Sequence, residues 1–152
     1  MELSRAEKLE LAQKHDTKGD TLVELAMDDD NVVRFLTAKN FSTPAEGLLV
    51  LAGEREIVEI PIAVARHFKA RFKGVFWKLV DHPHYAVRME LAGNPYVSIS
   101  IMWKLAKDPE WLVRREVAVH ATQRHVKILK FLARDECEFV RKAAMRNIHF
   151  SQ

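Results

Sequence analysis

Arginine is the residue whose spacing in this chain first suggests chemistry, because it recurs in the pair Val-Arg. The pair stands at residues 33–34, 87–88, 113–114 and 140–141. A guanidinium group is permanently charged and presents five N–H donors, so these arginines could serve catalysis or bind an anion or an acidic partner. The choice depends on whether Val-Arg is a local motif or the period of the whole chain.

A second candidate is the stretch at residues 65–85, "ARHFKARFKGVFWKLVDHPHY", which alternates basic and aromatic residues. Such a mixture is typical of nucleic-acid binding, where cations meet phosphates and rings stack on bases. However, Phe68, Phe72 and Phe76 are four residues apart, which predicts the apolar stripe of one helix beside a solvated stripe. We favour this structural interpretation. The basic residues of the stretch are Arg66, Lys69, Arg71, Lys73 and Lys78.

Metal binding and catalysis have weaker support in the sequence. His82 and His84 flank a proline without a carboxylate or cysteine set of the usual ligand spacing, and Cys137 is the only cysteine. Phosphate-binding loops and the common hydrolase motifs are missing as well. We therefore expect no cofactor, no metal and no enzymatic activity.

The Val-Arg pair belongs to a repeat of 26 to 28 residues that runs through the chain. Five leucines anchor it, and a large apolar residue precedes each leucine by three positions. The pair follows eight and nine positions after the leucine in four of the five repeats, whereas the second repeat has Glu59-Ile60 there. The anchors are Leu25, Leu51, Leu79, Leu105 and Leu132.

Each repeat predicts two short helices. In residues 98–120 one apolar stripe precedes Asp108-Pro109-Glu110, which we interpret as the N-cap and first turn of the second helix. Asn94-Pro95 predicts a helix end, with the asparagine in the left-handed conformation, and Asn40, His120 and Asn147 occupy the same position. Helices this short persist only when their stripes are buried on neighbours.

The expected fold is therefore all-α, a solenoid of about 5.5 two-helix repeats that forms a single domain over residues 1–152. Residues 9–17 align with residues 35–43, so a half-repeat or cap begins the array. The predicted boundaries are residues 1–20 for the cap and 21–46, 47–74, 75–100, 101–127 and 128–152 for the repeats.

The unit Leu-Ala-x-Asp-Pro-x-x-x-Val-Arg-x-x-x-Ala-x-Asn-Pro, clearest in residues 79–120, resembles the leucine-rich repeat variant, a bacterial α-solenoid related in shape to HEAT repeats. The resemblance covers roughly residues 9–150 and implies a right-handed superhelix of longer and shorter helices, the shorter often of 3₁₀ type. Some members carry a cysteine-ligated iron–sulfur cluster in an N-terminal segment. This chain lacks those cysteines, so the resemblance implies no cluster here. Some HEAT-like solenoids are DNA glycosylases, so the resemblance leaves such an activity as the remaining enzymatic alternative. It would draw on a tryptophan and an acidic residue from Trp77, Trp103, Trp111, Asp81, Glu90 and Glu116.

Because the arginines keep the register of the leucines, we favour a structural role for them over a catalytic or binding role. In that interpretation each arginine bonds an acidic group or carbonyl at a neighbouring helix end. The predicted ladder comprises Arg34, Arg88, Arg114 and Arg141 with Asp28, Asp108 and Asp135.

Charge is unevenly distributed along the chain. Residues 1–68 carry 8 Lys and Arg against 13 Asp and Glu (net −5), whereas residues 69–152 carry 16 against 8 (net +8). An anionic partner or an ordinary charged surface would both explain the split. The candidate binding surface comprises Arg66, Lys69, Arg71, Lys73, Lys78, Arg114, Arg115, Arg124, Lys127, Lys130 and Lys142.

These observations predict a non-enzymatic module that binds another protein on a curved repeat surface. The alternative is nucleic-acid binding through the basic C-terminal half. Apolar residues make up 48% of the chain without a run long enough to span a membrane, so no membrane partner is expected. The single cysteine suggests a reducing cytoplasm. We expect a monomer or a weak homodimer.

Overall fold

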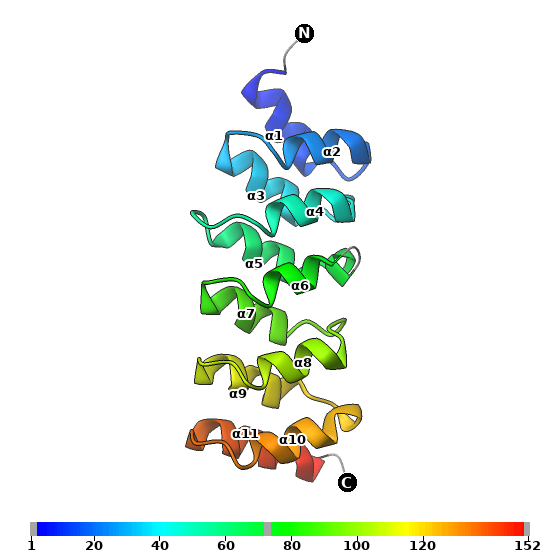
Figure 1. Ribbon diagram of the computed structural model, residues 1–152. Helices are drawn as coiled ribbons and strands as arrows, with labels where there is room; N and C mark the ends of the chain where they lie inside the picture. Colours follow the sequence, from blue (N-terminus) through cyan, green and yellow to red (C-terminus); the bar gives the residue numbers. More distant parts are fainter. Residues whose placement is uncertain (1–2, 72–73, 151–152) are drawn as a thin grey trace. The chain divides into compact units, whose positions relative to one another are not determined.

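The protein is all-helical in the computed structural model, which describes residues 3–71 and 74–150 (Figure 1). Eleven α-helices and two 3₁₀ helices account for its regular structure, and no strand occurs in these ranges. The all-α prediction is confirmed. The helices are α1 (Arg5–Gln13), α2 (Gly19–Leu25), α3 (Asn31–Lys39), α4 (Ala45–Leu51), α5 (Glu59–Arg66), η1 (Phe68–Arg71), α6 (Val75–Leu79), α7 (Tyr85–Ala92), α8 (Ile99–Leu105), α9 (Trp111–His120), η2 (Gln123–His125), α10 (Val126–Leu132) and α11 (Glu138–Phe150).

The chain divides into two compact units, residues 1–79 and 80–152. In the first unit α3 packs between α1 and α5, while α4 contacts α2 and α6 (Figure 1). In the second unit α9 packs between α7 and α11, with α8 and α10 beside them. Each unit therefore has a layer of odd-numbered helices and a layer of even-numbered helices, apart from its 3₁₀ segment.

The repeated apolar positions form the cores of both units. All five anchor leucines are buried, and so are the large apolar residues three positions before them. Burial of these side chains supplies most of the stabilisation of such short helices, which are marginal by themselves. Both helix types of the repeat are α-helical, and 3₁₀ structure is confined to η1 and η2 in the part of the chain that is described.

The second repeat is shifted by one residue relative to the alignment predicted from the sequence. Ile60 is fully buried in α5, as Val33 is in α3. Ile60 therefore takes the place of the repeated valine, and Pro61 takes the place of the arginine. The prediction that Glu59-Ile60 replaces Val-Arg was wrong by one position, because the loop before α5 contains an extra residue.

The turn between the two helices of each repeat is closed by a side chain. Asp108 was predicted as the N-cap of the second helix, but α9 begins at Trp111 with Glu110 as its N-cap. Asp108 instead accepts a hydrogen bond from the Glu110 N–H at 2.9 Å, within the turn. The same bond, from the N–H two residues ahead, is accepted by Asp28, Glu54, His82 and Asp135.

The asparagines at the helix ends do not adopt the predicted left-handed conformation. Asn40, the C-cap of α3, has φ −72° and ψ 118°, and the C-cap of α7 is Gly93 rather than Asn94. The Asn40 side chain instead donates to the carbonyls of Ala12 and Lys14 at the end of α1. Its role is to join two successive odd-numbered helices.

His120, which occupies the same repeat position as Asn40 and Asn94, behaves differently. Helix α9 continues through His120 and ends at the C-cap Ala121. The exposed His120 ring bonds Glu116 on its own helix at 2.8 Å. The prediction that His120 acts as a C-cap was therefore wrong.

The region from Phe68 to Phe76 does not form the single helix predicted from its phenylalanine spacing. Phe68 begins the 3₁₀ helix η1, whereas Phe76 is buried in the separate helix α6. Phe72 lies outside the described residues. The Phe68 ring stacks on His67 at 5.3 Å between centroids and remains partly exposed.

None of the helices in the described ranges has the length and apolar character needed to cross a lipid bilayer.

Candidate binding surfaces

The repeated arginines bind the turns that precede their helices. In Arg34, Arg88 and Arg114 the Nη1 group donates to the two carbonyls six and five residues earlier, at 2.7–3.1 Å. Arg141 makes the same pair of bonds to the carbonyls of Asp135 and Glu136. Both bonds come from the Nη1 nitrogen, so the Nε and Nη2 groups of the guanidinium can bind a second partner, which the single nitrogen of a lysine could not do as well.

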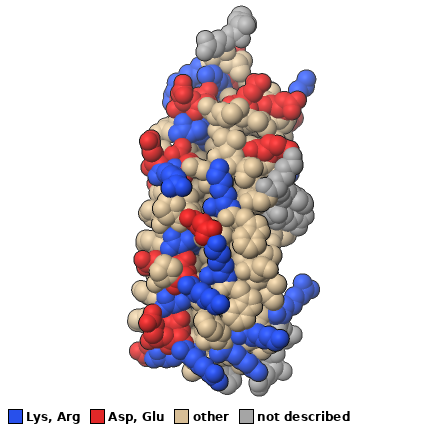
Figure 2. All heavy atoms as spheres, viewed as in Figure 1, with Lys and Arg blue, Asp and Glu red and all other residues tan. Residues whose placement is uncertain are grey.

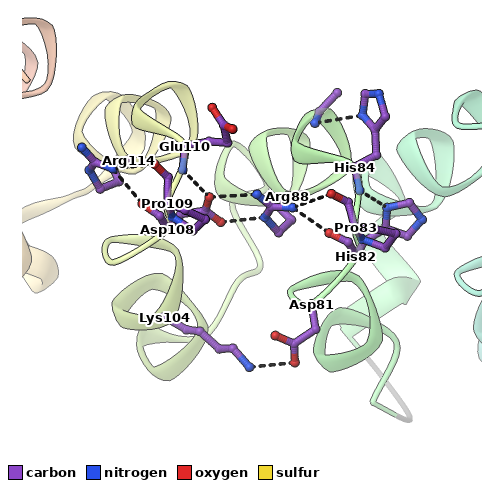
Figure 3. A network of polar contacts seen from close by, with 11 residues as sticks. Asp81, His82, Pro83, His84, Arg88, Lys104, Asp108, Pro109, Glu110 and Arg114 are labelled. Carbon is purple, nitrogen blue, oxygen red and sulfur yellow. Dashed lines mark hydrogen bonds and ion pairs between the residues drawn. The ribbon is translucent and has the colours of Figure 1, made fainter.

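Three of these arginines also bind the acidic residue of the following repeat. Arg88 forms a two-bond pair with Asp108 at 2.7 and 2.9 Å, and Arg114 forms the same pair with Asp135 (Figure 3 shows the first). Arg34 binds Glu54 at 2.9 Å. The pairs lie 20 or 21 residues apart along the chain, so each one ties a repeat to the next.

Electrostatics at these pairs favour the charged forms. Hydrogen bonding to Asp108 raises the pKa of Arg88, and bonding to Asp135 raises the pKa of Arg114. Burial pushes the pKa of Asp135 upward, but bonds from Arg114 and from the Cys137 N–H outweigh it and leave that pKa below its ordinary value. These are the contacts of a structural ladder.

The half-repeat at the N-terminus continues this ladder with a lysine. Lys8 binds Asp28 at 2.8 Å and lies 20 residues before it, as Arg34 lies 20 residues before Glu54. That hydrogen bond is the main reason that the pKa of Asp28 is lowered. Helix α1 therefore corresponds to the second helix of a repeat.

The candidate cations of the first unit lie apart from those of the second. Lys69 is half-buried with Nζ 3.4 Å from the Ser42 carbonyl, and the Lys78 ammonium donates to the Leu49 carbonyl at 3.0 Å. Arg66 is exposed in the last turn of α5. Lys73 and the Arg71 side chain lie outside the described residues.

The remaining candidates fall on different sides of the second unit. Arg114 is buried in the ladder, so its guanidinium is not accessible to a macromolecular ligand. Arg115, its neighbour in sequence, is exposed and lines a groove with Lys142. Lys127 and Lys130 are exposed on α10, and Arg124 is exposed in the preceding η2.

We define the α9–α11 groove as a hollow of about 540 Å³ whose walls combine cations and apolar side chains. Its lining residues are Arg115, Val119, Phe139, Lys142, Ala143, Arg146 and Asn147. Phe139 is 60% exposed and its ring lies 5.4 Å from that of Trp111, also exposed. Lys142 binds Glu138 on its own helix at 2.5 Å, whereas Arg146 has no ionic partner among the described residues.

We define the α10 basic face as Lys107, Lys127, Lys130, Phe131 and Arg134. All five side chains are exposed, and Figure 2 shows Lys and Arg side chains gathering over α8 and α10. The contact between Trp103 of α8 and Phe131 of α10, 5.7 Å between ring centroids, holds the two helices together here.

The sequence did not single out Lys107, Phe131 or Phe139. Phe131 lies one position before an anchor leucine, where no other repeat carries an aromatic residue. Lys107 lies two positions after one, where only the last repeat also carries a cation, Arg134. Only the packing of α8 against α10 brings these positions together. A comparison of equivalent positions in successive repeats would have found the change of residue type, but not the contact.

The paired histidines at the start of α7 are occupied by backbone contacts. The Nδ1 atom of His82 accepts from the His84 N–H, and that of His84 accepts from the Ala86 N–H (Figure 3). Within residues 3–71 and 74–150, no three His, Cys, Asp or Glu side chains come together as a metal site requires.

A buried histidine makes stability depend on pH in the first unit. His67 stacks on Phe68, its Nδ1 accepts from the Lys69 N–H, and its Nε2 donates to the Asn40 carbonyl. Burial is the main cause that lowers the pKa of His67. As pH falls below about 6.5 the unfolded chain takes up this proton first, so the free energy of unfolding should decrease.

The prediction is tested by urea unfolding of the wild type and of His67→Asn at pH 7.5 and 5.5. Asparagine occupies the equivalent position at residue 40, so the variant should fold. The variant should lose part of the pH dependence of the free energy of unfolding. His125, whose pKa is also lowered mainly by burial, continues to contribute. An equal change in both proteins between the two pH values would contradict this role for His67.

Comparison with known proteins gives no relative from which a function could be transferred. No family model, no curated protein and no solved structure matches the chain.

Proposed function

We propose that the protein is a non-enzymatic binding module whose partner is another protein, held in the α9–α11 groove. The observation that carries the proposal is the exposed pair Trp111–Phe139 beside the groove cations. Protein interfaces are enriched in aromatic residues and arginine, and their strongest contacts centre on such side chains.

The chemistry of the groove defines the partner segment that fits it. Val119 and Phe139 offer an apolar contact, while Arg115 and Arg146 offer positive charge. An acidic segment that carries a large apolar side chain would satisfy both. Glu116 binds His120 at 2.8 Å and reaches Arg115 only at 4.0 Å, and Glu138 binds Lys142, so both acids have a closer partner than the groove arginines.

The architecture proposed with this function is a right-handed superhelical solenoid of the leucine-rich repeat variant or HEAT-like type. Its support is the recurrence of buried leucines, of the arginine ladder and of the side-chain-closed turn within each unit. Repeat proteins of this kind bind macromolecules on extended surfaces. A reducing cytoplasm remains the proposed setting, and a monomer or weak homodimer the proposed state.

The groove is tested with labelled ten-residue peptides in which one Phe, Leu or Trp stands among Asp and Glu. Fluorescence anisotropy should show that they bind the full chain more tightly than peptides in which Ser replaces the apolar residue or Lys replaces the acids. Phe139→Ala and Arg115→Glu should each weaken binding about tenfold, because they remove the anchor contact and reverse a rim charge.

The matched control is Lys127→Glu, the same kind of charge reversal on an exposed helix position outside the groove. It should leave peptide affinity unchanged. Failure of all acidic peptides to bind at low salt, or equal losses in the control, would overturn the assignment of this groove. Light scattering measures whether the protein forms a dimer, which would indicate that a second copy of the chain occupies the groove.

A further inference from the structure

The even-numbered helices of the second unit carry an ion pair in one repeat that is lost in the next. Lys104, one position before its anchor leucine, binds Asp81, two positions after the preceding anchor, at 2.7 Å (Figure 3). The equivalent positions one repeat later are Phe131 and Lys107. Lys107 therefore occupies the position of the acid Asp81, and Phe131 occupies the position of the cation Lys104.

Lys107 is one of several cations on this face that have no anionic partner within residues 3–71 and 74–150. Within the described residues, Lys107, Lys127, Lys130 and Arg134 form no ion pair. Six of the eight acidic side chains of residues 80–152 already lie within 4.0 Å of a Lys, Arg or His nitrogen. Most acids of the unit are therefore paired with groups other than these four cations.

The four cations surround an exposed aromatic ring. Lys127 and Lys130 lie three residues apart on α10, which places them on one helix face about 4.5 Å apart along the axis. Arg134 follows in the turn after α10, and Lys107 lies 5.9 Å above the Trp103 ring. Phe131, 45% exposed, contacts the same Trp103 and follows Lys127 by four residues, which places both on one face of α10.

A groove of about 960 Å³ runs beside this ring. Lys107, Lys130, Phe131 and Arg134 line it. Its acidic lining residues Asp108, Asp135 and Glu136 are each bonded to a ladder arginine, so much of their charge is offset. The groove thus offers free cations and an aromatic surface together, which is the combination found in proteins that bind single-stranded nucleic acid.

We propose that the α10 basic face binds a single-stranded nucleic acid. The backbone phosphates contact Lys107, Lys127, Lys130 and Arg134, and an unpaired base packs against Phe131. This site shares no residue with the α9–α11 groove, so it is independent of the protein-binding function proposed above.

Two features favour this ligand over other anions. A duplex would use the cations but not Phe131, because its bases are stacked on one another. A run of acidic residues would pair with the cations, but unlike a nucleic acid it does not carry a flat ring beside each negative charge to place on the exposed phenylalanine. The site therefore predicts a preference for unpaired strands, little dependence on base sequence and a strong dependence on salt.

The experiment measures the anisotropy of fluorescein-labelled dT12 and rU12 with the full-length protein from 25 to 200 mM salt. Up to four phosphate contacts give a slope of log affinity against log salt of about −3. The double variant Lys127→Glu/Lys130→Glu should bind at least tenfold more weakly at the lowest salt. Its salt slope should be shallower by about half. Phe131→Leu keeps an apolar side chain but removes the ring, and should weaken binding at least fivefold without changing the slope.

Lys142→Glu is the control, because it reverses a lysine that is also exposed but lies in the α9–α11 groove. It should leave oligonucleotide binding unchanged, and Lys107→Glu provides a second test on a different helix. Absence of binding at 25 mM salt would overturn the proposal. So would equal losses in Lys142→Glu, tighter binding of a twelve-base-pair duplex, or equal affinity for polyglutamate of similar length.

Discussion

Replacement of Arg114 by alanine is expected to destabilise the protein by about 3–5 kcal/mol, the range for breaking a buried ion pair from one side. The Arg114 side chain is 9% exposed and that of its partner Asp135 is 7% exposed. The variant would leave the Asp135 carboxylate buried without its guanidinium. It would also leave the carbonyls of Asp108 and Pro109 without their side-chain donor.

Urea unfolding, followed by circular dichroism, measures this loss. Arg114→Lys should be only a partial replacement, since one ammonium cannot reproduce both the carbonyl bonds and the two-bond carboxylate pair. Arg115→Ala is the matched control, because Arg115 is exposed and should change stability by less than about 0.5 kcal/mol. Similar effects of Arg114→Ala and Arg115→Ala would show that the ladder is not structural.

A double variant separates the cost of an unpaired charge from the value of the pair. Arg114→Met with Asp135→Leu removes both charges and retains apolar volume, so it should be more stable than Arg114→Ala alone. It still loses the bond from Asp135 to the Cys137 N–H, which closes the turn. We therefore expect a recovery that stops short of the wild type.

The repeat could be predicted from the sequence because burial acts on one residue type at a fixed spacing. Leu25, Leu105 and Leu132 face the core of their units, so substitution by polar residues would be costly and the period stays visible. The arginines could be placed for the same reason, since they keep a constant distance from the leucines. Their partners, Asp108 and Asp135, also fall at one position of the repeat.

Local backbone geometry could not be predicted in the same way. Counting from the anchor misplaced Ile60 by one residue, because nothing in the sequence shows that the loop before α5 is longer. Residue spacing offered only weak support for His82 as a metal ligand and did not indicate the role it has, which is to accept at Nδ1 the same turn N–H bond that Asp108 accepts. Histidine and aspartate can both occupy this turn position, because each places an acceptor atom within reach of the N–H two residues ahead.

The binding surfaces were the hardest part to infer. Arg114 and Arg115 are adjacent and identical in residue type, yet one is buried and bonded in the ladder while the other is exposed. Whether a cation is available depends on which acid reaches it in space. Sequence counts of Lys and Arg cannot distinguish Lys104, which Asp81 pairs, from Lys107, which lacks an acid partner in the described structure.

Asn40 provides the second large effect, because its side chain bonds three backbone groups while it is buried. Its Nδ2 donates to the carbonyls of Ala12 at 2.8 Å and Lys14 at 3.0 Å, and its Oδ1 accepts from the Ser42 N–H at 2.9 Å. Asn40→Ala should destabilise the protein by about 2–4 kcal/mol, since it leaves buried polar groups without partners. Thermal and urea unfolding would measure the loss, with exposed Asn31→Ala as the control.

Asn40→Asp separates hydrogen bonding from packing at the same site. Aspartate keeps the shape of asparagine and the acceptor for the Ser42 N–H, but it replaces both donated bonds with a negative charge beside two carbonyl oxygens. It should therefore be at least as destabilising as alanine at pH 7, because a charge is buried without a partner. Protonation restores one O–H donor, so its deficit relative to the wild type should shrink as pH falls toward 4. If Asn40→Asp were as stable as the wild type at pH 7, the two bonds that Asn40 donates to the end of α1 could not stabilise the packing of α3 against α1.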